Sequence, residues 1–440
     1  MNGPFPSSDA HLAEPRRLDV PSRDQLLAKY ARTETFCRWI LGLEITVGAG
    51  LWILWMARGF PNAGWPAGVA LVIATFGVFR FIPRSVFLNK KRLQDIRPDA
   101  RFGDHSRDSL VRLADAVFAK LGLPHNAAPV YLIRAKDVNA HAVRCELWPG
   151  KPAFNGVFLN RSLLHLLDEP ELACVIGHEL GHVFPYAPLL SRSYIVHAFV
   201  AGAIAFSAVH LFPAPATAIM APLGILWALD FLVALPHARQ SRSIEFLCDD
   251  FGARAGGLLP ALSGEVKLAA ENETRQQLLL QVLEARQRGS QVAFADLFEA
   301  YETAVPFGRA DPAAFEREFG QLLDRQRARS GQVSLGGFLQ SLSGADSDGS
   351  DAAITETVEQ LQTVLSLPIL PIDRNKYLQG SALWTDTLAG NLVDHIRADP
   401  HRVLFRLANE VDDRASTHPS ASRRILFLYN HHSSRSSVFG

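Results

Sequence analysis

The chain has 440 residues, of which 48% are hydrophobic and 20% are charged, so its apolar share lies at the top of the globular range and its charged share below the usual ~25%. Its 44 lysine and arginine residues balance its 44 aspartate and glutamate residues, and it therefore lacks the basic excess of an ordinary nucleic-acid binder. This composition also excludes a disordered chain and a collagen-like fibre.

The N-terminal part of the chain changes from polar to strongly apolar. Residues 1–35 are rich in proline and serine, and we expect a mobile tail. Two apolar stretches follow, Phe36–Gly59 and Trp65–Ile82, each near the ~20 residues that cross a bilayer. Tryptophans lie towards their ends, as at a membrane interface, while Glu44 needs a partner or an interfacial position. The pattern predicts a transmembrane hairpin, and the alternative is two buried helices of a soluble core.

A second apolar block lies in the middle of the chain. Between Ser193 and Ala238 there is no lysine, arginine or glutamate, and a proline-rich turn divides the block into Tyr194–Leu211 and Ala216–Leu235. This predicts a second hairpin and about four transmembrane helices in total. Basic residues flank the outer ends of both hairpins, so the positive-inside rule places the polar segments in the cytoplasm. The arginine-rich, lysine-poor composition suggests a bacterial protein, and we expect it in the inner (plasma) membrane.

Between the hairpins the sequence has a globular pattern. The β-rich stretches Pro129–Ile133, Val138–Cys145 and Ala153–Leu159 predict a small sheet. Asp168 is the expected N-cap of the helix that follows. After Phe251 the chain becomes mostly helical and polar, which indicates an α+β membrane protein in which helices predominate.

The helix after Asp168 contains the motif His178-Glu179-Leu180-Gly181-His182. Histidines at i and i+4 share one helix face and can reach one tetrahedral ion, and Glu179 is placed to take a proton from a metal-bound water. The alternative is a helix with two surface histidines. The other residues of this helix are apolar almost all round, however, and two imidazoles there need partners such as a metal.

A catalytic zinc site requires a third protein ligand. A histidine in the spacing H-x-x-x-H-x-x-G-x-x-H is excluded, because those positions hold Pro185 and Pro188. Residues 183–244 contain no glutamate, so Glu245 is the first candidate, and Asp249 lies one helical turn later. Glu245 would bind the metal, and Asp249 would accept the outer N–H of a ligand histidine. The alternative for this acidic pair is a solvated helix face.

This order of motifs resembles the HtpX-like membrane zinc metallopeptidases, which are gluzincins related to the type I CAAX prenyl endopeptidases. Val138–Ala142 is similar to the family's edge strand beside the substrate, and Asn155–Asn160 to the strand before the zinc helix. Ser416–Pro419, followed by Arg424 and Ile425, is similar to its C-terminal signature S-T-H-P-x-x-x-x-R-I.

The resemblance implies a mostly helical zincin-type catalytic domain that uses Zn²⁺ and lies at the cytoplasmic face. Its implied activity is hydrolysis of peptide bonds in membrane or misfolded proteins, with a polypeptide substrate and membrane lipid as partners. Asn139 would align the substrate on the edge strand, and His418 would stabilise the oxyanion. The alternatives are a CAAX-type processing protease and a catalytically silent membrane scaffold or sensor. The sequence makes no prediction of oligomeric state.

Two departures from the family pattern concern spacing and one subsite. The separation of Asp249 from His418 is longer than expected, which predicts a helical insertion of unknown role. His141 replaces the usual aromatic residue after Asn-Ala, and a strand-surface histidine is the simplest interpretation. Cys174 and Cys248 flank the site residues, and we expect small buried side chains there, with tuning of the metal as the alternative.

The predicted organisation begins with a tail (1–35), a transmembrane hairpin (36–83) and the sheet with the zinc helix (100–192). A second hairpin (193–236), the third-ligand helix (237–255), the insertion (256–400) and the C-terminal part of the peptidase domain (401–430) follow.

Overall fold

The structure is a computed structural model that divides into two compact units. The unit that we call the sheet unit comprises Pro21–Leu164 and Leu172–Gly257, and the helical unit comprises Met1–Val20, His165–Glu171 and Leu258–Gly440. The residues that the structure describes are 18–59, 68, 90–125, 127–133, 139–148, 151–189, 194–211, 240–287, 351–411 and 418–436.

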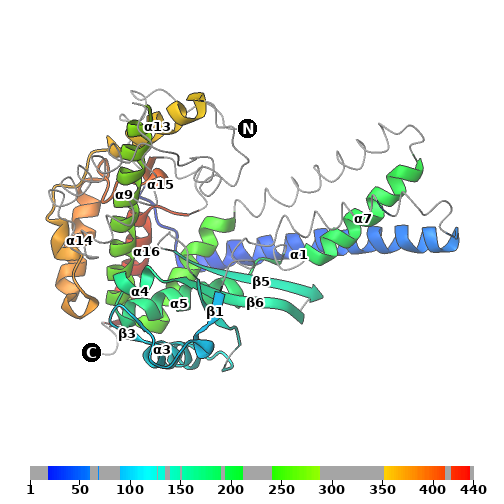
Figure 1. The fold of residues 1–440 in the computed structure, drawn as a ribbon, viewed down its shortest axis with the longest axis horizontal. Coiled ribbons are helices and arrows are strands. Elements are labelled where there is room, and N and C mark those ends of the chain that lie inside the picture. The colour runs from blue at the N-terminus through cyan, green and yellow to red at the C-terminus, as the bar shows by residue number, and fades with distance from the viewer. Residues whose placement is uncertain are drawn as a thin grey trace, which may run out of the picture. The chain divides into compact units, whose positions relative to one another are not determined.

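A four-stranded mixed sheet in the order β1-β4-β6-β5 gives the sheet unit its name (Figure 1). Its strands are β1 (Lys90–Arg92), β4 (Val130–Ile133), β5 (Ala140–Trp148) and β6 (Lys151–Asn160). β4 and β6 are parallel, and the other two pairings are antiparallel. The three β-rich stretches in the sequence are thus confirmed as strands. β1 was not predicted, because Lys-Lys-Arg shows no apolar alternation.

Shorter elements complete this part of the sheet unit. They are η2 (Leu93–Asp95), a two-stranded sheet of β2 (Arg101–Phe102) and β3 (His105–Ser106), and the helix α3 (Arg107–Lys120). α3 begins with a capping box, in which the side chains of Ser106 and Ser109 each accept a backbone N–H of the other residue.

The first helix, α1 (Arg23–Ala57), begins earlier than the sequence predicts. Ser22 and Gln25 form a capping box at its start, and this signal fixes the first turn although the residues there are polar. The predicted tail 1–35 is therefore wrong for residues 23–35, which are helical. Glu44 is buried, with 7% of its surface exposed.

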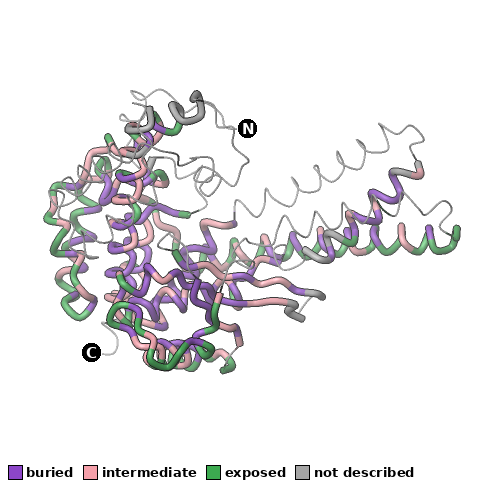
Figure 2. The backbone as a smooth tube through the Cα atoms, in the orientation of Figure 1, coloured by how far each residue is buried: buried purple, intermediate pink, exposed green. Residues whose placement is uncertain are grey.

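α1 packs along α7 (Tyr194–Leu211), and the two helices lie side by side in Figure 1. Gly48 of α1 has no room for a side chain, because a Cβ there would lie 2.8 Å from Val200 Cγ2. The buried indole of Trp55 donates a hydrogen bond to Ser207 Oγ at 2.8 Å. Figure 2 shows green segments that recur along α1, and these are exposed residues of the helix.

The number of transmembrane helices needs correction. Among the described residues one helix, α1, is long and apolar enough to cross a membrane, in place of the four that the sequence predicts. The third predicted span coincides with α7, whose short apolar stretch runs from Phe199 to Ala208. The spans Trp65–Ile82 (apart from Gly68) and Ala216–Leu235 lie outside the described residues.

The helical unit is built around α9 (Leu258–Gln287), which packs against α13 (Asp351–Leu365), α14 (Asp386–Ala398) and α16 (Ala421–Ser436). Leu283 of α9 and Val358 of α13 share one buried apolar cluster. The other elements are η3 (Arg374–Tyr377), η4 (Ser381–Leu383) and α15 (Ala408–Val411).

Asp168 caps α5 (Glu169–Val183), the helix that follows α4 (Leu163–Leu166), as the sequence predicts. Its Oδ1 accepts the Glu171 N–H at 3.1 Å, and Glu171 Oε2 accepts the Asp168 N–H at 2.9 Å, which completes a capping box. Glu171 also binds Lys267 of α9 at 2.7 Å, so a buried ion pair fixes the first turn of α5 within the helical unit.

Candidate metal centre

His178 and His182 lie one turn apart on α5, in the part of this helix that belongs to the sheet unit. Their Nε2 atoms are 3.2 Å apart. Leu180, between them, is fully buried, so the backbone of this turn is fixed by packing. The two imidazoles are partly exposed, with 15% and 24% of their side-chain surface accessible.

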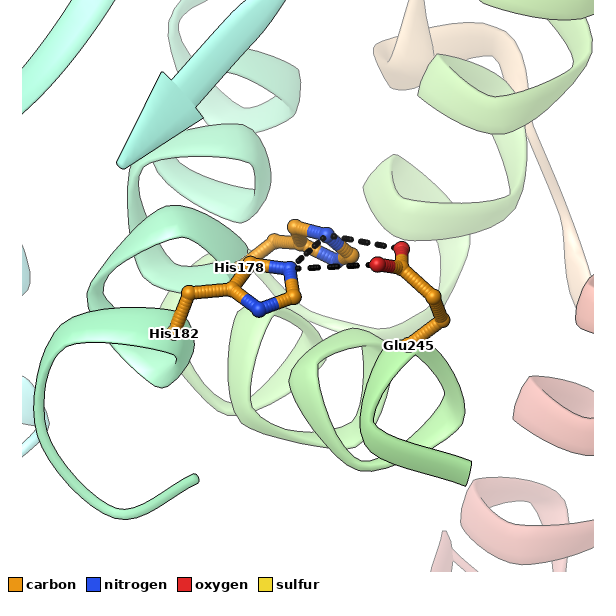
Figure 3. Close-up of side chains that lie close together, drawn as sticks. All are labelled: His178, His182 and Glu245. Carbon is orange, nitrogen blue, oxygen red and sulfur yellow. Dashed lines mark hydrogen bonds and ion pairs between the residues drawn. The ribbon is translucent and has the colours of Figure 1, made fainter. Parts of the chain in front are cut away.

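The third member of the group comes from the helix over residues 240–256. The Glu245 carboxylate places Oε2 at 3.5 Å from His178 Nε2 and Oε1 at 3.4 Å from His182 Nε2. Figure 3 shows both rings turned towards this carboxylate. His178, His182 and Glu245 thus each offer one ligand atom, and these atoms lie within 4.8 Å of one another.

The separations of these atoms fit a zinc ion. Ligands that lie ~2.0–2.1 Å from a tetrahedral zinc are separated by ~3.3 Å from one another. The 3.2 Å between the two Nε2 atoms is close to this value, as are the 3.4 and 3.5 Å from the two histidines to different oxygens of the Glu245 carboxylate. Two imidazole nitrogens and one carboxylate also form a donor set that leaves a fourth position open, as a catalytic site requires.

Asp249 holds the outer nitrogen of the first histidine. His178 Nδ1 lies 2.8 Å from Asp249 Oδ1, so Nδ1–H donates to the carboxylate and Nε2 is left free for a metal. Burial alone lowers the pKa of the His178 imidazole, but hydrogen bonds to Asp249 and Glu245 and their negative charges outweigh burial and raise the pKa to about 10. The site therefore favours a positive charge strongly.

Small residues bring the two helices into backbone contact. A Cβ on Gly177 would lie 2.8 Å from Ala255 Cβ, and one on Gly181 would lie 2.9 Å from Cys248 Sγ. This close approach lets the short Glu245 side chain reach both histidines. This contact was not predicted, although the Gly-x-x-x-Gly spacing on α5 was a usable signal.

The two cysteines near the site serve this packing. Both Cys174 and Cys248 are buried, and the Cys174 thiol lies 3.6 Å from the Gly257 carbonyl oxygen, to which it donates. Cys248 fills the space that the missing side chain of Gly181 leaves. The structure thus agrees with the prediction of small buried side chains at both positions.

The comparison with known families agrees with this geometry. Residues 104–431 match peptidase family M48, which is most of the chain. The chain belongs to peptidase family M48. It is therefore a zinc-dependent metalloendopeptidase with a polypeptide substrate, and the group His178, His182 and Glu245 can hold the metal. No solved structure matches the chain.

In this M48 peptidase, β5 lies at one edge of the sheet, as the resemblance implies for the strand beside the substrate. Asn139 is exposed immediately before β5, and its carbonyl accepts the Asn160 N–H at 3.2 Å. Arg144 of β5 donates to the Val183 carbonyl at 2.6 Å, which ties the edge strand to the end of α5. The role of Arg144 was not predicted, because no local pattern signals such a long-range bond.

Three other predicted residues have defined surroundings. Glu179 is buried beside His178, with 7% of its surface exposed. The His141 ring stacks on Phe158 of β6, with centroids 4.9 Å apart. His418 belongs to the helical unit, where it is exposed just before α16.

The M48 C-terminal signature is fixed inside the helical unit. Asn409 Nδ2 donates to the Pro419 carbonyl at 3.0 Å, and Arg424 pairs with Glu265 of α9 at 2.8 Å. These two contacts restrain the chain on both sides of residues 420–423.

Proposed function

We propose that this M48 peptidase is a membrane-embedded endopeptidase whose zinc is held by His178, His182 and Glu245. The observation that carries the proposal is the set of ligand-atom separations, 3.2, 3.4 and 3.5 Å, across two helices in backbone contact. Asp249 supports it, because it fixes the His178 ring with Nε2 directed at the other ligands.

Bound zinc supplies a Lewis acid, which acidifies a water molecule and polarises the peptide carbonyl. Glu179 takes the proton from the attacking water and passes it to the leaving amine. His418 donates a hydrogen bond to the carbonyl oxygen as this oxygen becomes negative. Asn139, at the start of the edge strand, aligns the substrate backbone so that the peptide adds to the sheet as a further strand.

The proposed location is the bacterial inner membrane, with the catalytic residues on the cytoplasmic side and membrane or misfolded proteins as substrates. α1 supports a membrane position, because a row of large apolar side chains on it is exposed. These are Phe36, Trp39, Leu43 and Val47, spaced by three or four residues and between 43% and 77% exposed. Water disfavours such a row, whereas lipid accommodates it.

The test measures zinc and cleavage on the same purified samples. Wild type should hold one zinc per chain and cleave a casein-like substrate. His178→Ala, His182→Ala and Glu245→Ala should each lose zinc, whereas Glu179→Gln should keep zinc and lose cleavage. His125→Ala is the matched control, because His125 is an exposed residue of the same unit, and it should behave as wild type.

Two results would contradict the proposal. Full zinc retention by Glu245→Ala would remove this residue from the ligand set. Zinc binding by wild type without turnover on any protein or peptide substrate would favour a silent scaffold. Proteomics of host membranes that contain wild type or Glu179→Gln would then identify the substrates, since these should accumulate with the inactive variant.

A further inference from the structure

The first turns of α1 contact the segments that carry the candidate metal centre, within the sheet unit. Arg23, the first residue of α1, has its Nε 3.1 Å from Asp250 Oδ2. The Asp250 side chain is completely buried, and Arg254 on the same helix also donates to Oδ2, at 2.5 Å. Asp250 directly follows Asp249, the residue that holds His178.

Two more residues of α1 extend this contact along the same side of the helix. The Tyr30 ring packs edge-on against Tyr186, with centroids 5.8 Å apart, and its hydroxyl lies 3.5 Å from the Ala187 carbonyl oxygen. The buried Glu34 carboxylate accepts the Leu189 N–H at 3.1 Å. Residues 186–189 lie shortly after α5, which ends at Val183, and Asp250 lies in the helix that carries Glu245. α1 thus contacts the chain near both groups of ligands.

The environment of Arg23 differs from that of Arg32, another basic residue near this end of α1. Arg32 is exposed, as expected of a charge at a membrane surface, and its Nε donates to the carbonyl of Ala28 one turn earlier on the same helix. Arg23, by contrast, is 22% exposed and directs its Nε at a fully buried carboxylate. Arg254 of the same helix still pairs with Asp250 when Arg23 is removed, but the ion pair that joins this helical turn to the start of α1 is lost.

We propose that Arg23 is a positioning residue for the zinc site. Its guanidinium holds Asp250 and thereby fixes the helical turn that presents Glu245 and Asp249. The proposal rests on the proposed function, since it assumes that Glu245 and two histidines bind zinc. A small rotation of this turn lengthens the 2.8 Å contact between Asp249 and His178 and misaligns the Glu245 carboxylate.

The consequence is a mechanical link between the membrane helix and the site. α1 is one continuous helix of 35 residues, or ~52 Å at ~1.5 Å per residue, whereas a hydrocarbon core is ~30 Å thick. Its polar first turns therefore extend beyond the bilayer. A tilt of α1 in the membrane is transmitted through Arg23 to the helix that carries Glu245.

The experiment uses the full-length chain in detergent and compares Arg23→Ala, Arg23→Gln and Arg23→Lys with Arg32→Ala as the matched control. Zinc affinity is measured by competition with a chromophoric chelator, and site geometry by the visible absorption of the Co²⁺-substituted protein. We expect both Arg23→Ala and Arg23→Gln to lower zinc affinity by ~10-fold and to change the Co²⁺ spectrum. This loss is at the low end of the range for mutation of residues that hydrogen-bond to metal ligands. Arg23→Lys should recover part of the affinity, and Arg32→Ala should equal wild type.

A double-mutant cycle with Asp250→Asn separates this pair from a general loss of fold. If Arg23 acts through Asp250, Arg23→Ala should have little further effect on zinc affinity in the Asp250→Asn background. Wild-type affinity and Co²⁺ spectrum in both Arg23→Ala and Arg23→Gln would overturn the inference and leave the proposed function intact. An equal loss in Arg32→Ala would overturn it as well. If wild type itself binds no zinc, the proposed function fails instead.

Discussion

His178 is the residue where the electrostatics of the site are most pronounced. Its pKa of about 10 means that the metal-free site keeps an imidazolium at neutral pH, between two carboxylates. Zinc binds the neutral ring, so the proton must leave when the metal enters. We predict release of about one proton from His178 at pH 7.5, and a zinc affinity that rises with pH until about pH 10.

Calorimetry in buffers of different ionisation enthalpy measures this proton. Asp249→Asn should reduce the release, because it removes the charge that raises the pKa of His178. The folded pKa lies above the ordinary 6.5, so the protonated ring stabilises the metal-free protein below that pH, and the contribution disappears as pH rises towards about 10. Zinc binding with no proton release would contradict this description of the site.

His418 is a second residue with a specific expected effect. A donor to the oxyanion acts mainly in the transition state, so His418→Ala should lower kcat by ~10²–10³-fold and change KM little. Zinc content should stay at the wild-type level, because His418 is not a proposed ligand. Kinetics and zinc content are measured on one sample. Wild-type turnover would exclude the oxyanion role, and joint loss of zinc and turnover would indicate a ligand or a structural residue.

At the scale of elements, the contact between α5 and the helix over residues 240–256 sets the ligand separations. Gly181→Ala places a Cβ 2.9 Å from Cys248 Sγ and 3.2 Å from Cys248 Cα, so the helices must move apart. We expect a stability loss of ~1–3 kcal/mol, as for other overpacked cores, and a fall in zinc affinity of ~10-fold or more.

Thermal unfolding and chelator competition test this contact. Gly50→Ala on α1 is the matched control, because its added Cβ meets nothing within 4 Å, and zinc affinity should not change. A second change, Cys248→Ala, removes the sulfur and should restore part of the affinity of Gly181→Ala. If Gly181→Ala binds zinc as tightly as wild type, the helix spacing does not control the site.

These elements also show what the sequence could and could not predict. The spacing of His178 and His182 and the cap at Asp168 are local, so helix periodicity alone places them correctly. The start of α1 was missed because its polar composition resembles a tail, although the Ser22–Gln25 capping box was visible. The Arg144–Val183 bond joins residues 39 positions apart, and no local pattern could reveal it.

At the scale of the whole chain, the match to M48 runs through the segment predicted as an insertion. Within the helical unit, α9 packs directly against α16, and Glu265 of α9 pairs with Arg424 of the C-terminal signature. Glu273 of α9 further binds Arg374 at 2.6 Å and accepts the Arg406 N–H at 3.0 Å. The described part of this segment thus forms the core on which the C-terminal signature rests.

Membrane topology is the prediction that concerns the whole molecule. The polar first turns of α1 carry basic residues and contact Asp250 and Ala187, so if α1 spans a membrane we expect the metal centre on the same side as the N-terminal end of α1. The positive-inside rule predicts that this side is the cytoplasm. If the apolar stretch Trp65–Ile82 returns the chain across the membrane, as its sequence predicts, a periplasmic reporter fused after Asn62 should be active, and one fused after Asp95 or Asp250 inactive. Because α1 exposes a row of large apolar side chains, the protein should also stay in membranes washed with carbonate. Activity of the Asp95 fusion would invert the orientation, whereas release by carbonate would show that α1 is not a membrane anchor and that its apolar row has a protein partner.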